Sequence, residues 1–243
     1  MDYAIIIYII FGLLPSLTWL LYYLRKDVHP EPKKTILRIF LWGALITIPV
    51  FLVQLGLASV LENLPISGLA TSLLYWFVVI SFSEELFKYL VIRMKIIDSP
   101  DLDEPLDIML YMVVAALGFA ALENILYLFT PISDMPTDQL MMRTMIISFI
   151  RFVGATFLHT LCSALIGYSM AISFCKVEKK YLSFGFGLFL AVLLHGLYDF
   201  SIMTLDGQLK LAVPVIVIIT LAFLVFAGFE RLKKIKSVCQ ITK

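Results

Sequence analysis

The sequence predicts an all-α integral membrane protein, a polytopic helix bundle of about seven transmembrane helices. Hydrophobic residues make up 61% of the 243 residues and charged residues only 15%. A soluble domain is about half apolar and about a quarter charged. The mean hydropathy of +0.96 points the same way. Most of the chain should therefore lie in a bilayer, and we expect one integral membrane domain over residues 1–243.

The predicted spans follow from length, because a transmembrane helix needs about 20 mostly apolar residues. The N-terminus carries Asp2 where a signal peptide would be basic, so we expect its apolar run to be a retained helix. The fifth stretch is long enough to tilt or to extend past the bilayer. Prolines inside spans can be absorbed as kinks by neighbouring helices. The seven stretches are residues 3–24, 39–61, 70–92, 107–129, 144–175, 182–204 and 211–229, with Pro15, Pro49 and Pro214 inside.

Basic residues set the orientation of these spans. They gather in three alternate loops, 25–38, 93–106 and 176–181, and in the C-terminal tail. The three remaining segments between spans hold only Arg143 and Lys210. By the positive-inside rule, the N-terminus lies outside and the C-terminus in the cytoplasm. In the loop that precedes the fourth span we expect Asp107 at a helix N-terminus. The basic ends are formed by Arg25, Lys26, Lys33, Lys34, Arg38, Arg93, Lys95, Lys176, Lys179, Lys180, Arg231, Lys233, Lys234, Lys236 and Lys243.

Ionisable side chains inside the spans are few, and they fall on four consecutive spans. Each costs several kcal/mol if it faces lipid, so each should face the bundle interior or a wet cavity. A rise of ~1.5 Å per residue places the key side chains ~13–25 Å from the cytoplasmic ends, so they can meet near mid-membrane. This clustering favours a functional site over a structural polar network. The residues are Glu84, Glu85, Lys88, Glu123, Arg151, His159, His195 and Asp199.

Helical spacing indicates which of these residues share a face. Residues four apart are neighbours on a helix, so Glu84 and Lys88 can pair and Asp199 can orient His195. The same spacing joins Glu123 to Tyr127, with Asn124 adjacent, and forms a stripe of Arg151, Ala155, His159 and Ser163.

The cluster has the groups needed to hydrolyse a peptide bond inside the bilayer. A buried carboxylate can act as general base on water, a histidine can share that task, and an amide can stabilise an oxyanion. The sequence contains neither GxSxG nor HExxH, and Asp199 is the sole mid-span aspartate. We favour a mechanism without a cofactor. The alternative is a zinc ion held by Glu84 or Glu85 together with His159 and His195.

Other classes of membrane protein use the same side chains. Buried Glu, His and Lys form proton relays in transporters and channels, although no internal repeat is visible here. Two histidines can also be axial haem ligands. A protease-like fold without activity is a further alternative, and a lone Glu84–Lys88 pair could simply hold two helices in register.

Four motifs in order resemble those of the PrsW family of intramembrane proteases, within the superfamily of CAAX prenyl endopeptidases and bacteriocin-processing enzymes. SFSEELFKYL (81–90) resembles the EExxK motif of that family. The others are GFAALENILYLF (118–129), FLHTLCSALIGY (157–168) and LLHGLYDF (193–200), and the loop RKDVHPEP (25–32) is also similar. The resemblance covers about residues 10–230, with its core motifs over 81–200.

The resemblance implies a glutamate-type protease of a bacterial plasma membrane. Its substrate would be a single-span membrane protein such as an anti-sigma factor, cut first in its extracytoplasmic part under stress. Membrane lipid is the other expected partner, and no nucleic acid is expected. The implied catalytic residues are Glu84, Glu85 and His195, supported by Glu123 and His159. The CAAX branch has asparagine where this sequence has Asp199, which argues against an oxyanion role copied from that branch and against prenylated substrates.

Overall fold

The computed structural model describes residues 3–25, 30–129, 137–175 and 180–235. These residues form nine α-helices and one π-helix and contain no strand. Seven helical segments are long and apolar enough to cross a membrane, which confirms the predicted all-α, seven-span bundle. Several residues named above lie outside the described residues, namely Asp2, Lys26, His29 within the 25–32 motif, Lys176, Lys179, Lys236 and Lys243.

Five of the seven spans are single helices. The second span begins earlier than the predicted residue 39 and is therefore longer than a bilayer requires. Pro15, Pro49 and Pro214 lie inside helices that continue through them. The helices are α1 (Tyr3–Leu24), α2 (Lys33–Glu62), α5 (Pro105–Leu128), α8 (Lys180–Thr204) and α9 (Leu209–Leu232).

Helix α5 is the centre of the bundle. In its most apolar 18-residue stretch, 94% of the residues are buried. In the corresponding stretch of any other span, at most 39% are buried. It packs against α1 and α2 on one side and against α7 (Ala155–Cys175) on the other. Its N-terminus is closed by a capping box in which the Asp107 carboxylate accepts from the Glu104 backbone N–H, 2.7 Å away. The predicted helix N-terminal role of Asp107 is confirmed.

The third span differs from the single helix expected over residues 70–92. It consists of α3 (Gly68–Leu74), the π-helix η1 (Tyr75–Phe82) and α4 (Ser83–Lys95). A π-helix leaves carbonyls without their usual i+4 partners. Ser83 compensates, because its hydroxyl donates to the carbonyls of Val79 and Ile80 at 2.6 and 3.0 Å. The wide turns end directly before Glu84, so they set the direction in which that carboxylate points.

The fifth span is two helices, α6 (Thr137–Val153) and α7, separated at Gly154. A side chain at Gly154 would meet the Tyr198 hydroxyl on α8 at 2.4 Å. The carbonyl of Phe152 accepts from the indole N–H of Trp19 on α1, 2.9 Å away. Trp19 also stacks on Phe157 just beyond the break, at 4.3 Å between ring centroids. The interruption is thus supported by two other helices, which local sequence could not reveal.

Helices α2 and α5 cross with their backbones in contact through glycine. A Cβ built on Gly118 would lie 1.9 Å from the Phe40 carbonyl oxygen, and one on Gly43 would lie 2.1 Å from the Ala115 carbonyl oxygen. Small residues at such crossings allow close packing of membrane helices. The crossing also brings Gln54 of α2 to Ser83 and Glu84.

A Gly118→Ala substitution is expected to destabilise the protein by about 1–3 kcal/mol, because backbone atoms must move apart to admit the methyl group. Chemical unfolding in detergent micelles would measure the loss. The matched control is Gly185→Ala on α8, where an added Cβ meets nothing within 4 Å. That change should be neutral or slightly stabilising, since alanine favours a helix by about 1 kcal/mol. Equal stability of the two variants would contradict the assigned crossing.

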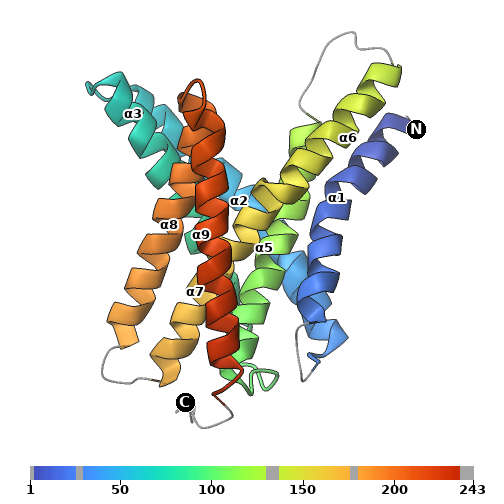
Figure 1. Ribbon diagram of the computed structural model, residues 1–243, viewed down its shortest axis with the longest axis vertical. Helices are drawn as coiled ribbons and strands as arrows, with labels where there is room; N and C mark the ends of the chain where they lie inside the picture. Colours follow the sequence, from blue (N-terminus) through green and yellow to red (C-terminus); the bar gives the residue numbers. More distant parts are fainter. Residues whose placement is uncertain (1–2, 26–29, 130–136, 176–179, 236–243) are drawn as a thin grey trace.

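Basic residues of α4 lie at one end of the bundle. Figure 1 shows the N-terminus at one end and the C-terminus at the other. The end with the C-terminus also carries the close of α4 and the start of α5, together with Arg93 and Lys95. The positive-inside rule uses such basic residues to predict a cytoplasmic C-terminus. The orientation itself stays a prediction.

Candidate active site

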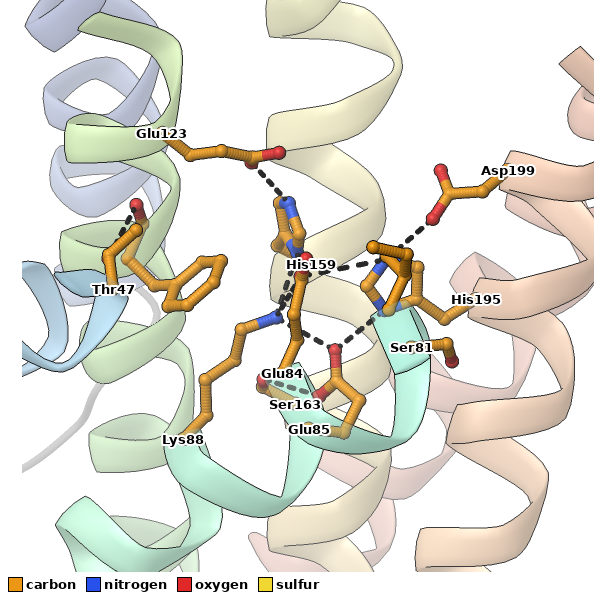
Figure 2. A network of polar contacts seen from close by, with 12 residues as sticks. Thr47, Ser81, Glu84, Glu85, Lys88, Glu123, His159, Ser163, His195 and Asp199 are labelled. Carbon is orange, nitrogen blue, oxygen red and sulfur yellow. Dashed lines mark hydrogen bonds and ion pairs between the residues drawn. The ribbon is translucent and has the colours of Figure 1, made fainter. Parts of the chain in front are cut away.

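Four consecutive spans bring their ionisable side chains into one buried cluster. Glu84, Glu85 and Lys88 come from α4, Glu123 from α5, His159 from α7, and His195 and Asp199 from α8 (Figure 2). The two imidazole rings are perpendicular, with centroids 5.1 Å apart. The predicted meeting of these side chains within the bundle is confirmed by the distances below.

Glu85 has both carboxylate oxygens occupied. One oxygen accepts from the Lys88 ammonium at 2.8 Å and lies 2.9 Å from His195 Nδ1. The other accepts from the Ser163 hydroxyl at 3.1 Å. Glu85 and Lys88 are both 0% exposed. A carboxylate held this way positions its neighbours and has no oxygen free for a water molecule.

Glu84 differs from Glu85 because one of its oxygens is free. Its Oε1 accepts from the Gln54 amide at 3.3 Å. Its Oε2 is buried and has no hydrogen bond from any described residue. The nearest polar atoms to that oxygen are Lys88 Nζ at 3.5 Å, His159 Nδ1 at 3.7 Å and His195 Nε2 at 3.9 Å. A buried polar atom without a partner is rare and marks a place where a ligand or water is expected.

Glu123 and Arg151 fix the orientation of His159. The His159 Nε2 atom lies 2.8 Å from Glu123 Oε2, which also pairs with Arg151 Nη2 at 2.9 Å. With its proton on Nε2, His159 leaves the Nδ1 lone pair to accept from Lys88 Nζ, 2.8 Å away. Arg151 is itself held, since its Nε donates to Asn124 Oδ1 at 2.5 Å and its guanidinium lies 4.7 Å from the Tyr127 ring centroid.

His195 lies between two carboxylates. Its Nδ1 faces Glu85 at 2.9 Å and its Nε2 faces Asp199 Oδ2 at 3.2 Å. Asp199 therefore orients the imidazole, as the spacing of four predicted. Figure 2 shows the two carboxylates on opposite sides of the ring, with Glu85 on the side of Glu84 and Lys88.

The more exposed acidic side chains of the cluster lie on one edge. The side chains of Glu123 and Asp199 are 32% and 23% exposed, whereas that of Glu84 is 7% exposed. Glu123 lies near the C-terminal end of α5 and Asp199 near that of α8. Both ends point away from the end of the bundle that carries the C-terminus. The accessible edge of the site therefore faces the predicted extracytoplasmic side.

Glu84, His159 and His195 form a group whose ligand atoms lie within 4.8 Å of one another. In a tetrahedral zinc site with bonds of about 2.0–2.2 Å, neighbouring ligand atoms are ~3.3 Å apart. The spacings of 3.7 and 3.9 Å from Glu84 Oε2 to the two histidine nitrogens need only a small contraction. The free Glu84 oxygen and this donor set fit a divalent metal such as zinc. Lys88 would have to release the His159 Nδ1 lone pair.

A second group of possible ligands, Glu85, Cys162 and His195, fits less well because both Glu85 oxygens already accept hydrogen bonds. Cys162 is a buried free thiol, as predicted for a residue in an apolar stretch.

Some residues that contact the site are not ionisable, so their charge does not mark them in the sequence. Gln54 contacts Glu84, and Thr156 accepts from the Asn124 amide at 3.0 Å. Phe119 covers the Lys88 ammonium, with 4.5 Å from Nζ to the ring centroid. Gln54 is a neutral amide in the middle of a predicted span, so a search for all polar residues within spans would have found it.

Comparison with known proteins identifies relatives along most of the chain. The family described as PrsW family intramembrane metalloprotease matches residues 31–227. The protein named Protease PrsW of Oceanobacillus iheyensis is 30% identical over 86% of this chain and 88% of its own. Those of Geobacillus kaustophilus and Bacillus subtilis are 30% and 29% identical, covering 79% and 93% of this chain and 78% and 94% of theirs. No solved structure matches the chain.

Proposed function

This chain belongs to the PrsW family of intramembrane proteases, and from that premise we propose that it makes the first, extracytoplasmic cut in a single-span anti-sigma factor. The observation that carries the proposed chemistry is the free Oε2 of Glu84, buried among two histidines and a lysine. Family membership favours hydrolysis over the proton relay considered above.

In the proposed mechanism Glu84 is the group that polarises the attacking water. Gln54 holds one Glu84 oxygen by a hydrogen bond, so the other points into the reacting space. Lys88 Nζ lies 3.5 Å from that oxygen and places a positive charge beside it. His195 Nδ1 is held by Glu85, whereas its Nε2 lies 3.2 Å from Asp199 and 3.9 Å from the free Glu84 oxygen, so an Nε2 proton can pass from the contact with Asp199 to the developing oxyanion. Glu85 acts through Lys88 and His195 and is a positioning residue.

Glu84, His159 and His195 are the residues that would hold a divalent metal. Such an ion would supply Lewis-acid polarisation of the scissile carbonyl and would lower the pKa of a bound water. The family description favours this alternative over the cofactor-free mechanism expected from sequence. Glu123 and Arg151 fix His159 from its far side, as partners of metal-binding histidines do.

The proposed side of cleavage is supported by the accessible edge of the site. Glu123 and Asp199 are its most exposed acidic groups, and both lie towards the predicted extracytoplasmic end. A substrate segment that unwinds from that end of its span would pass these two residues before it reaches Glu84. Tyr127, half exposed beside Arg151, lies on the same path.

The test is co-reconstitution of the purified chain with candidate single-span anti-sigma factors in liposomes. Wild-type protein should release a fragment whose new terminus maps to the extracytoplasmic side of the substrate span. Proton flux without cleavage of any candidate would instead support the transporter alternative. In a parallel arm the protein is dialysed against a chelator and its zinc content is measured. Zinc bound in an equimolar amount, with cleavage that fails after its removal and returns with zinc, would support the metal alternative. Full cleavage by metal-free protein would support the mechanism in which Glu84 polarises the water.

A further inference from the structure

We propose that the groove between α1 and α2 is a binding site for one anionic phospholipid of the leaflet into which Lys33 projects. The proposal concerns a face of the bundle remote from Glu84 and does not depend on the protease assignment. It names a ligand class, a phospholipid with a net negative headgroup, and a place for both its chain and its headgroup.

The groove exists because two consecutive helices do not pack on each other. Within the described residues α1 and α2 make no close contact, although both pack on α5. Figure 1 shows α2 leaning away from α1 from their shared end near residue 30. A cavity of ≈ 580 Å³ lies between them, within the usual range of about 300–1,000 Å³ for small-molecule sites. Its walls are formed by leucines of α1 and by Ile36 and Phe40 of α2.

The dimensions of the groove favour an acyl chain. The lining leucines of α1 run from Leu13 to Leu24, a rise of ~16 Å at 1.5 Å per residue. This is about half of a hydrocarbon core of about 30 Å, so the groove spans one leaflet.

The charges at the polar end of the groove favour a negative headgroup. Lys33 lines the groove, and Lys34 follows it; both are exposed, and neither has an ion pair with any described residue. Glu31 also lines the groove; it accepts a hydrogen bond from the Tyr111 hydroxyl of α5 and lies within a group of carboxylates with Asp103 and Asp107 beside the start of that helix. Juxtamembrane lysines attract anionic lipids of the cytoplasmic leaflet. The predicted orientation places this end in that leaflet.

Native mass spectrometry of the full chain in detergent tests the site, with dioleoyl phosphatidylglycerol and dioleoyl phosphatidylcholine as probes. Wild type should retain one phosphatidylglycerol at concentrations that leave phosphatidylcholine unbound. Lys33→Gln with Lys34→Gln should weaken phosphatidylglycerol binding about 25-fold, roughly fivefold per lysine. Leu37→Trp, which fills the groove, should abolish retention of both lipids.

Matched controls separate this site from general lipid contact. Lys210→Gln removes an exposed lysine at the opposite end of the bundle, and Leu211→Trp places a tryptophan at an exposed position on α9. Both should bind phosphatidylglycerol as wild type does. Equal retention of the two lipids by wild type would overturn the headgroup assignment. Unchanged retention by Leu37→Trp would overturn the groove as the place of binding.

Discussion

A Glu84→Gln variant is expected to fold and insert normally but to cleave its substrate about 10²–10⁴-fold more slowly, the usual contribution of a general base. The amide keeps the size of the side chain and can keep the contact with Gln54. It replaces the oxygen that faces His159 and His195 by an uncharged NH2 group. Cleavage in liposomes, quantified against the amount of folded protein, would measure the effect.

Glu62→Gln is the matched control, because it makes the same change at an exposed position at the end of α2. It should cleave at the wild-type rate. Glu85→Gln is the informative comparison, since it also lowers activity but removes a partner of Lys88, His195 and Ser163. We therefore expect Glu85→Gln to lose stability as well, and Glu84→Gln to keep it. Full activity of Glu84→Gln would remove Glu84 from the proposed mechanism.

Replacing Lys88 by methionine is expected to cost about 3–5 kcal/mol of stability, because it leaves the Glu85 carboxylate buried without its cation. Lys88 Nζ contacts Glu85 and His159 at 2.8 Å each and is fully buried. Methionine retains most of the volume, so a cavity contributes little to the loss. Unfolding by denaturant in mixed micelles, followed by helical circular dichroism, would measure the change.

The double variant Glu85→Gln with Lys88→Met distinguishes a lost ion pair from general damage. Neutralising both partners removes the unpaired charge, so the double variant should be more stable than Lys88→Met alone. Lys210→Met, at an exposed position, should leave stability unchanged. If the two losses simply add, the Glu85–Lys88 contact is not the source of the stability.

The same contact bears on metal binding. His159 has one lone pair at Nδ1, which Lys88 engages at 2.8 Å. A metal ligated by Glu84, His159 and His195 would compete with Lys88 for that nitrogen, whereas Glu85 would still hold the ammonium. Lys88 thus occupies, with its own positive charge, part of the space that the metal alternative requires.

The sequence alone determined the class of fold and most members of the site. An ionised group facing lipid costs several kcal/mol, so charges inside apolar spans must converge in the interior. That single energetic rule selects Glu84, Glu85, Lys88, Glu123 and His159 before any coordinates exist, and length alone delimits seven spans. Spacing of four correctly paired His195 with Asp199.

Only the tertiary structure decided which glutamate is free. Glu84 and Glu85 are adjacent in an apolar span, and no periodicity separates their roles. Their difference comes from three other helices. Ser163 and His195 contact the two oxygens of Glu85, whereas Gln54 holds one oxygen of Glu84 and leaves the other without a hydrogen bond. The π-helix is joined to α8, where the Val192 carbonyl accepts from the Ser81 hydroxyl at 2.6 Å, and the interruption at Gly154 lies against Tyr198 of α8 and beside Trp19 of α1. Hydropathy is a property of each segment and predicts its burial in lipid. These features depend on contacts between helices that are distant in the sequence, so no single segment predicts them.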